Sequence, residues 1–155
     1  MRQIPVWAVS LLVLLTACTS AGVAEKAGAE RPAGQGSVEV IVEGVESAKG
    51  TVYASIYLTE EGFPEEKELA YDYRYVAAES GTLRFYFESV PAGWFVVAVL
   101  HDTDANEELS LNLLGIPKED YGFSLNPDST WGPPLFDEAA VFLKADEAKT
   151  VVIKF

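Results

Sequence analysis

The chain has 155 residues, a formal net charge of −13, and a single residue each of His, Cys and Met. The acidic excess excludes the clustered Lys and Arg of a nucleic-acid-binding surface, so we expect no nucleic-acid partner. One Cys excludes a disulfide framework or a Cys-based zinc site within the chain, and one His excludes a multi-His metal site.

The first segment, residues 1–17, has the pattern of a secretory signal peptide. Arg2 precedes an apolar stretch over residues 4–17, which is shorter than the roughly 18 apolar residues that a membrane-spanning helix needs. The stretch runs into LTAC at residues 15–18, which resembles the lipobox of bacterial lipoprotein signals. The resemblance implies cleavage before Cys18 and a lipid on its thiol, which anchors the mature protein in a membrane. An ordinary secretory signal that contains a cysteine is the alternative.

The residues after this cysteine predict the location and a linker. Thr19 rather than Asp follows Cys18, which resembles the sorting pattern of outer-membrane lipoproteins. We therefore expect an envelope protein in the outer membrane, facing the periplasm or the cell surface. Residues 18–36 are rich in Ala, Gly and Glu and contain no aromatic residue, so we expect a flexible tether there. A poorly formed helix, interrupted by Gly28, is the alternative.

Residues 37–155 contain repeated strand patterns with turn residues between them. Most segments alternate apolar and polar residues, whereas 94–102 is apolar on both sides, as a central buried strand is. Ser80 and Gly81 indicate a tight hairpin turn, and no window predicts an amphipathic helix. The expected strands are 37–45, 51–59, 71–79, 82–90, 94–102, a short one over 121–125, 139–145 and 150–155.

This series of about seven strands predicts the fold class. We expect a single all-β domain over residues 37–155, an antiparallel β-sandwich of immunoglobulin or prealbumin type. A long loop excursion, from residue 103 to about 134, follows the central strand. The chemistry that the sequence indicates is concentrated at the start of that excursion and within it.

Oxygen-bearing side chains occupy alternate positions where the central strand ends. They are Asp102, Asp104, Asn106, Glu108 and Ser110. This spacing is typical of a Ca²⁺-binding loop, because a loop that curls round a hard cation turns alternate residues inward. Glu107 stands where such a loop has Gly, and Leu113 stands where it has a bidentate Glu. Two interpretations stay open: a weak divalent-ion site, or an Asx-rich turn whose side chains bond backbone N–H groups.

His101 shares its alternating position with Phe95, Val97 and Val99, which we assign to the outer face of the strand. Beside Asp102 it forms a hydrogen-bonded structural pair or, alternatively, part of a catalytic dyad. No nucleophile stands at a fixed spacing, so we expect no enzymatic activity. An enzyme that uses His101 and Asp102 would require both side chains to line an accessible pocket.

Glycine, proline and aromatic residues dominate the stretch 112–136. Gly and Pro make rigid turns, and the aromatic side chains supply apolar area. One interpretation is a satellite core. The other is an aromatic groove for a glycan, a peptide or an envelope protein, with a polar rim at Lys118, Glu119 and Asp120. The expected groove residues are His101, Lys118, Tyr121, Phe123, Trp131 and Phe136.

Long motifs in the folded part resemble one bacterial family. The most specific are HDTDAN at 101–106, NLLGIPKEDYGFS at 112–124 and WGPPLFDEA at 131–139. VEGVESAKGTVYASIYLTEEGFP at 42–64 and FESVPAGWFVVAVLHD at 87–102 extend the match over most of the domain. Together they are similar to the domain of unknown function 2141 family. The resemblance implies a secreted or envelope protein with an immunoglobulin-like sandwich, and it transfers no catalytic residues.

In many members of that family the acidic loop contains a Gly and a closing acid where this chain has Glu107 and Ser110. The sequence as a whole predicts a lipid-anchored envelope protein whose sandwich is a non-catalytic binding or interaction module, with a weak divalent-ion loop. The alternative is a purely structural or scaffolding lipoprotein without a ligand site.

Overall fold

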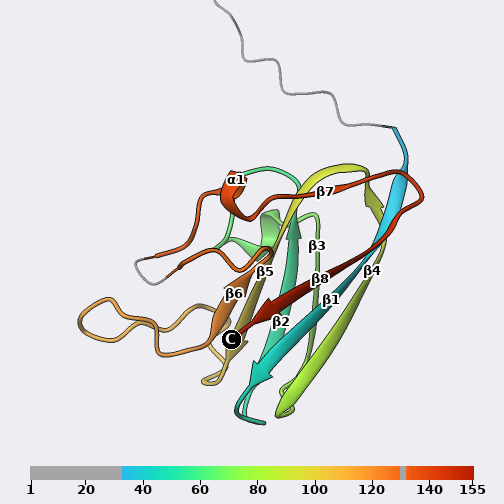
Figure 1. The fold of residues 1–155 in the computed structure, drawn as a ribbon. Helices are drawn as coiled ribbons and strands as arrows, with labels where there is room; N and C mark the ends of the chain where they lie inside the picture. The colour runs from blue at the N-terminus through green and yellow to red at the C-terminus, as the bar shows by residue number, and fades with distance from the viewer. Residues whose placement is uncertain (1–32, 130–131) are drawn as a thin grey trace, which may run out of the picture. The chain divides into compact units, whose positions relative to one another are not determined.

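A computed structural model describes residues 33–129 and 132–155 as two β-sheets packed face to face (Figure 1). This is the all-β sandwich that the sequence predicts. The strands are β1 (Gln35–Val45), β2 (Thr51–Tyr57), β3 (Asp72–Ala77), β4 (Gly81–Pro91), β5 (Gly93–Asp102), β6 (Tyr121–Phe123), β7 (Val141–Leu143) and β8 (Ala148–Lys154). Two short helical turns, η1 (Lys67–Leu69) and α1 (Phe136–Ala139), accompany them. Within the described ranges, no helix has the length and apolar character that a membrane crossing requires.

Several predictions concern residues outside these ranges. The signal peptide over 1–17, lipidation at Cys18, most of the tether over 18–36, and Trp131 all lie outside the described residues. Strand β1 begins at Gln35, so the folded part starts slightly before the expected boundary at residue 37.

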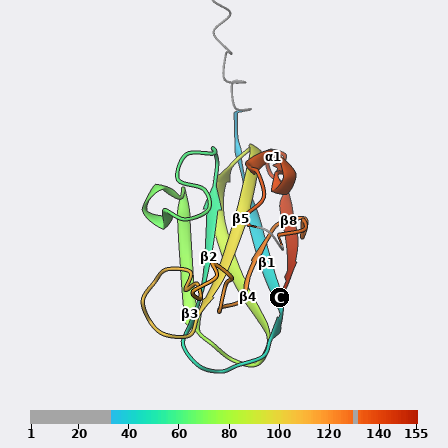
Figure 2. The same cartoon turned by 90° about the vertical axis from the view of Figure 1, so that its left-hand side faces the viewer.

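The two sheets differ in strand direction. The first sheet has the order β4-β1-β8, in which β1 is antiparallel to β4 but parallel to β8. The second has the order β3-β2-β5-β6 with antiparallel neighbours, and β7 pairs with the start of β5. Figure 2 shows β3, β2 and β5 of this sheet next to one another. The expectation of a purely antiparallel sandwich is therefore wrong for one pair. A parallel pair is possible here because the long connection that it needs is supplied by everything between β1 and β8.

The predicted hairpin turn at Ser80 and Gly81 is also wrong. Strand β3 belongs to the second sheet and β4 to the first, so the chain changes sheet between them. It changes sheet again between β1 and β2 and between β4 and β5. Apolar alternation indicates which side of a strand is buried, but it does not identify the neighbouring strand.

The main core lies between the sheets. Its fully buried members include Val38, Val40 and Val42 of β1, which the alternation pattern predicts. The row Phe95, Val97, Val99 and His101 of β5 also faces this core, so its assignment to the outer face is wrong. The error arises because β5 is apolar on both sides, and a strand of this kind does not reveal which side faces the other sheet.

A second, smaller cluster covers part of the opposite face of the second sheet. Its buried members are Tyr57, Val96, Ala98, Phe123 and Ala139, and Phe63, Tyr121 and Phe136 pack against them. The Phe63 ring meets Phe123 and Phe136 edge-on, with centroids 5.6 and 5.9 Å apart. Burial raises the pKa of Tyr57 to about 12, so its hydroxyl stays protonated and donates to the Pro64 carbonyl (3.1 Å).

Gly50 provides a test of how tightly the connection into β2 packs against the end of β5. Its φ is 87°, and a Cβ there would lie 2.0 Å from the Asp102 carbonyl oxygen. We expect Gly50→Ala to lower the free energy of unfolding by roughly 3 kcal/mol, because backbone strain adds to overlap with backbone atoms. Gly115→Ala is the matched control, since Gly115 also has positive φ (77°) but open space around it, and it should cost about 1 kcal/mol. Equal losses in chemical denaturation would contradict this packing.

Candidate functional site

Four of the five predicted ion ligands, and Lys118 of the predicted groove, lie on the β5–β6 loop, which we define as residues 103–120. Figure 1 shows this gold-to-orange segment extending away from both sheets. Two carboxylates are buried at its base, Asp102 (1% exposed) and Glu119 (6% exposed). Because a buried carboxylate is costly unless hydrogen bonds compensate it, their partners determine the shape of the loop.

Asp102 organises the first half of the loop. Its Oδ1 accepts the N–H groups of Asp104 (3.2 Å) and Ala105 (2.7 Å). Its Oδ2 accepts the N–H of Glu107 (2.9 Å). Ala105 and Glu107 have positive φ values of 62° and 64°, so the backbone turns sharply and directs these donors at one side chain. This is the Asx-rich turn that the sequence predicts as the alternative to an ion site.

Glu119 closes the loop from its other end. Its Oε1 accepts both the N–H (2.7 Å) and the hydroxyl (3.0 Å) of Thr103. Its Oε2 accepts the N–H of Ser110 (3.0 Å). The sequence predicts Glu119 in the polar rim of a groove and does not indicate this role. No spacing signal could have found it, because its proximity to Thr103 depends on the path of the whole loop.

The carboxylates at the base lie close together. One ligand atom each from Asp102, Asp104 and Glu119 lies within 4.8 Å of the others. Ser110 joins them, since its hydroxyl donates to Asp104 Oδ2 (2.8 Å), and Asn106 donates to that hydroxyl (2.7 Å). Across the described parts of the chain, no Lys or Arg forms an ion pair with these three carboxylates.

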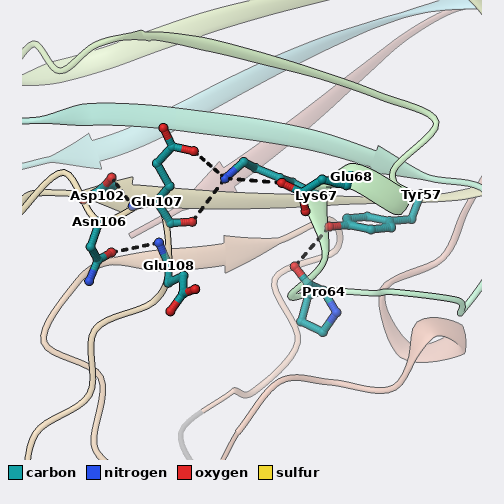
Figure 3. A network of polar contacts seen from close by, with 8 residues as sticks. All are labelled: Tyr57, Pro64, Lys67, Glu68, Asp102, Asn106, Glu107 and Glu108. Atoms are coloured by element: carbon teal, nitrogen blue, oxygen red, sulfur yellow. Dashed lines mark hydrogen bonds and ion pairs between the residues drawn. The ribbon is translucent and has the colours of Figure 1, made fainter.

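The five predicted ion ligands therefore do not converge as one set. Asp102 and Asp104 come together, Ser110 contacts Asp104, and Asn106 is one contact further away. The Glu108 side chain is exposed and points away from Asp102 (Figure 3), while its N–H donates to Asn106 Oδ1 (2.8 Å). Glu119, which the sequence pattern did not include, completes the cluster instead.

An ion pair fixes the loop to the segment between β2 and β3. Lys67 of η1 lies 2.8 Å from the Glu107 carboxylate and 3.4 Å from the Glu107 carbonyl oxygen (Figure 3). The hydrogen bond to Glu107 raises the pKa of Lys67 above its ordinary value of 10.5. The stabilisation from this pair is therefore fully present below pH 10.5 and is lost as the pH rises through the raised pKa.

His101 belongs to a separate, buried network. The ring is fully buried, and Nε2 donates to the Lys49 carbonyl (2.9 Å), since a carbonyl oxygen only accepts. Its Nδ1 has no hydrogen-bond partner, and Asp120 Oδ2 lies 3.9 Å away. The ring stacks on Phe155, with centroids 6.4 Å apart. His101 and Asp102 are thus covered and engaged separately, so they do not meet the condition that the enzyme hypothesis sets.

The described residues of the predicted aromatic groove do not gather in one place, and Trp131 lies outside the described residues. Phe123 and Phe136 pack in the second cluster, as the satellite-core interpretation requires. Tyr121 is half-buried against the same cluster, and its hydroxyl donates to the Ser129 carbonyl (2.6 Å). Tyr121 also lines an open hollow beside Asp120 and the last two residues of the chain, whereas Lys118 is exposed on the loop.

The end of the loop exposes apolar side chains, a feature that the sequence analysis missed. We call these residues the apolar tip; they are Leu111, Leu113, Leu114 and Ile116. Leu113 is fully exposed and Leu114 is 83% exposed. The apolar run broken by Gly115 and Pro117 could have indicated such a tip, because turn residues within an apolar segment oppose its burial in a strand.

Asn112 holds the apolar tip in one conformation. Its side-chain oxygen accepts the N–H groups of Leu114 (2.8 Å) and Ile116 (3.1 Å). Its own N–H donates to the Ile116 carbonyl (2.8 Å), and its carbonyl accepts the N–H of Gly115 (3.0 Å). The tip is therefore a closed, internally hydrogen-bonded turn.

Comparison with known proteins gives one positive finding. The model of a family described as uncharacterized protein conserved in bacteria (DUF2141) matches residues 40–151. This match confirms the family resemblance that the motifs indicate, and it includes the whole β5–β6 loop. No curated protein and no solved structure gives a significant match.

The role of Glu119 gives a testable prediction. We expect Glu119→Ala to lower the free energy of unfolding by about 2 kcal/mol, because two backbone N–H groups and a hydroxyl lose their acceptor in a partly buried position. Amide hydrogen exchange at Thr103 and Ser110 should accelerate more than exchange within β2. Glu108→Ala removes an exposed carboxylate of the same loop and should change stability by less than about 0.5 kcal/mol. Similar effects of both substitutions would show that Glu119 does not organise the loop.

Proposed function

Because this chain belongs to DUF2141, a family of uncharacterized proteins conserved in bacteria, we propose a function from its own geometry. The protein is a non-catalytic interaction module of the cell envelope, and its contact surface is the β5–β6 loop. One observation carries this proposal: the apolar tip is exposed to solvent on a turn that its own hydrogen bonds hold in place.

Exposed aliphatic side chains on a fixed turn favour a binding role over a merely structural one. A loop that only closes the sandwich gains nothing from exposing them, whereas contiguous exposed apolar side chains typically mark interaction sites. The loop is also held at its base by Asp102 and Glu119 and at its side by Lys67. A contact surface that is ordered before binding loses less conformational entropy when the partner binds.

The location at the envelope is supported by the sequence at residues 15–18, which resembles a lipobox. A lipid on Cys18 holds the module at a membrane, with the outer membrane as its site. The non-catalytic assignment is supported by the burial of His101 and Asp102. A glycan, a peptide, an envelope protein or the membrane itself are the classes of partner that suit this setting.

A second candidate function, binding of Ca²⁺, is favoured by the cluster at the base of the loop. Asp102, Asp104 and Glu119 bring ligand atoms within 4.8 Å of one another, and two of these side chains are buried. Oxygen donors are what Ca²⁺ prefers, but it takes six to eight of them. Since Asn106 and Glu108 do not complete the set, we propose a weak site with a dissociation constant of about 10⁻⁴–10⁻³ M, as in extracellular modules.

The interaction proposal is tested in the native cells by photo-crosslinking of the full chain. A photoreactive residue replaces Leu114 in one variant and Tyr86 in another; Tyr86 is 62% exposed on β4 of the first sheet. We expect adducts from position 114 and none from position 86, because only the apolar tip contacts a partner. Adducts from neither position would overturn the proposal and support the scaffolding alternative.

The same cells provide the control for the anchor. Growth with a labelled fatty acid should label the full chain but not its Cys18→Ala variant. Equal labelling of both would remove Cys18 as the lipidation residue, while the crosslinks from position 114 would still report on the loop.

The Ca²⁺ proposal predicts a shift in thermal stability. With a dissociation constant of about 1 mM, 10 mM Ca²⁺ should stabilise the folded state by about 1.4 kcal/mol, or roughly 5 °C in Tm relative to chelator. Asp104→Asn should remove this shift, and Asp137→Asn, an exposed carboxylate of α1, should leave it intact. A melting temperature that Ca²⁺ does not change would eliminate the ion site.

A further inference from the structure

Resting on the proposed interaction site, we propose that the partner of the apolar tip is the lipid bilayer itself. The tip inserts its aliphatic side chains into the interfacial region of the membrane, while the sandwich stays in water. The inference depends on three features of the described chain: the hydrogen bonding of the turn, the small area of the tip and the charges around it.

Several backbone N–H groups of the apolar tip already have hydrogen-bond partners within the turn. A segment that enters a bilayer must satisfy its N–H groups internally, because no water is available there. Within the turn, the N–H groups of Asn112, Leu114 and Ile116 all have partners in the same turn. The N–H of Lys118 donates to the Ser110 carbonyl (2.8 Å), and Pro117 has no N–H. These donors therefore need no partner from water. The N–H of Leu113 has no hydrogen-bond partner within the turn, so the turn suits shallow insertion into the interfacial region, where water still reaches that group.

The size of the tip favours a bilayer over a protein partner. Four aliphatic side chains bury on the order of 500 Å² at most, which is below the roughly 800 Å² that each partner contributes to a standard protein interface. The tip also projects from the domain as a convex turn (Figure 1). A bilayer needs no complementary surface, so a small convex tip is sufficient for it.

Charges around the tip are arranged for shallow insertion. Residues 109–117 contain no charged side chain, and the first one after them is the exposed Lys118. A lysine at this position can extend its ammonium group to the lipid phosphates while the leucines go deeper. Exposed acidic side chains of Asp104 and Glu108 lie on the same loop, so we infer a preference for membranes of low negative charge.

The test uses a segment that begins at residue 33, because both sheets and both apolar clusters lie within 33–155 and the segment holds its own core. The segment is mixed with vesicles of pure phosphatidylcholine and separated by flotation. We expect it to float, and we expect Leu113→Ser combined with Leu114→Ser to reduce its partition into vesicles at least about tenfold. A thermal melt confirms that each variant is folded.

A matched pair of substitutions serves as control. Leu69→Ser combined with Leu135→Ser removes two other exposed leucines, which are 49% and 72% exposed, and should leave flotation unchanged. Phosphatidylglycerol at 30% of the lipid should weaken binding, and added salt should restore it, because acidic side chains near the tip repel anionic lipid. Flotation that fails with phosphatidylcholine, or that both leucine pairs reduce equally, would overturn the inference. So would self-association of the segment that only the Leu113/Leu114 variant abolishes, since the tip would then bind a second copy.

The outcomes separate this inference from the proposed function. Protein or glycan adducts from position 114 in cells, together with no flotation, would leave the interaction module standing and reject the bilayer as its partner. Absence of both adducts and flotation would reject both. Lipid adducts from position 114 together with flotation support both.

Discussion

Strand β5 is covered on both of its faces, and the rest of the domain is arranged around that coverage. One face packs in the main core through Phe95, Val97 and Val99, and the other lies under the second cluster through Val96 and Ala98. A strand buried on both sides must also pair along both edges, because unpaired backbone groups in the interior are costly. Strand β2 pairs along one edge, and β6 and β7 divide the other between them.

This burial continues to the last residues of the strand and explains the loop that follows. Asp102 ends β5 almost without exposure, so its carboxylate must find donors within the protein. The loop supplies them from its own backbone, and Glu119 repeats the arrangement at the opposite end. Loop shape and carboxylate burial therefore depend on each other. Because its base is held in this way, the loop can expose leucines at its tip and does not pack them onto the sheet.

The local sequence pattern was sufficient to predict the strands and much of the core. It was not sufficient to predict which strands pair with one another. The alternation around Val40 and the turn chemistry at Asp102 depend on neighbouring residues only, and both predictions match the structure. The hairpin at Ser80 failed because partner choice depends on which sheet buries which face. The role of Glu119 was missed because a solvated acid and a buried one look alike in sequence. The outer assignment of His101 was wrong because β5 is apolar on both sides, so its sequence does not show which side faces the other sheet. The groove prediction does not match the structure for Phe123 and Phe136, because these rings pack in the second cluster.

The parallel pairing of β1 with β8 has a consequence for how the chain acquires its structure. Glu39 and Thr150, which are 111 positions apart, meet across that pair. Contacts between distant residues form slowly, because a long loop must close before any of them can form. The first sheet therefore cannot be completed before β8 has been synthesised and has reached β1. Until then β1 has only β4 as a neighbour in this sheet, so one edge of β1 stays unpaired.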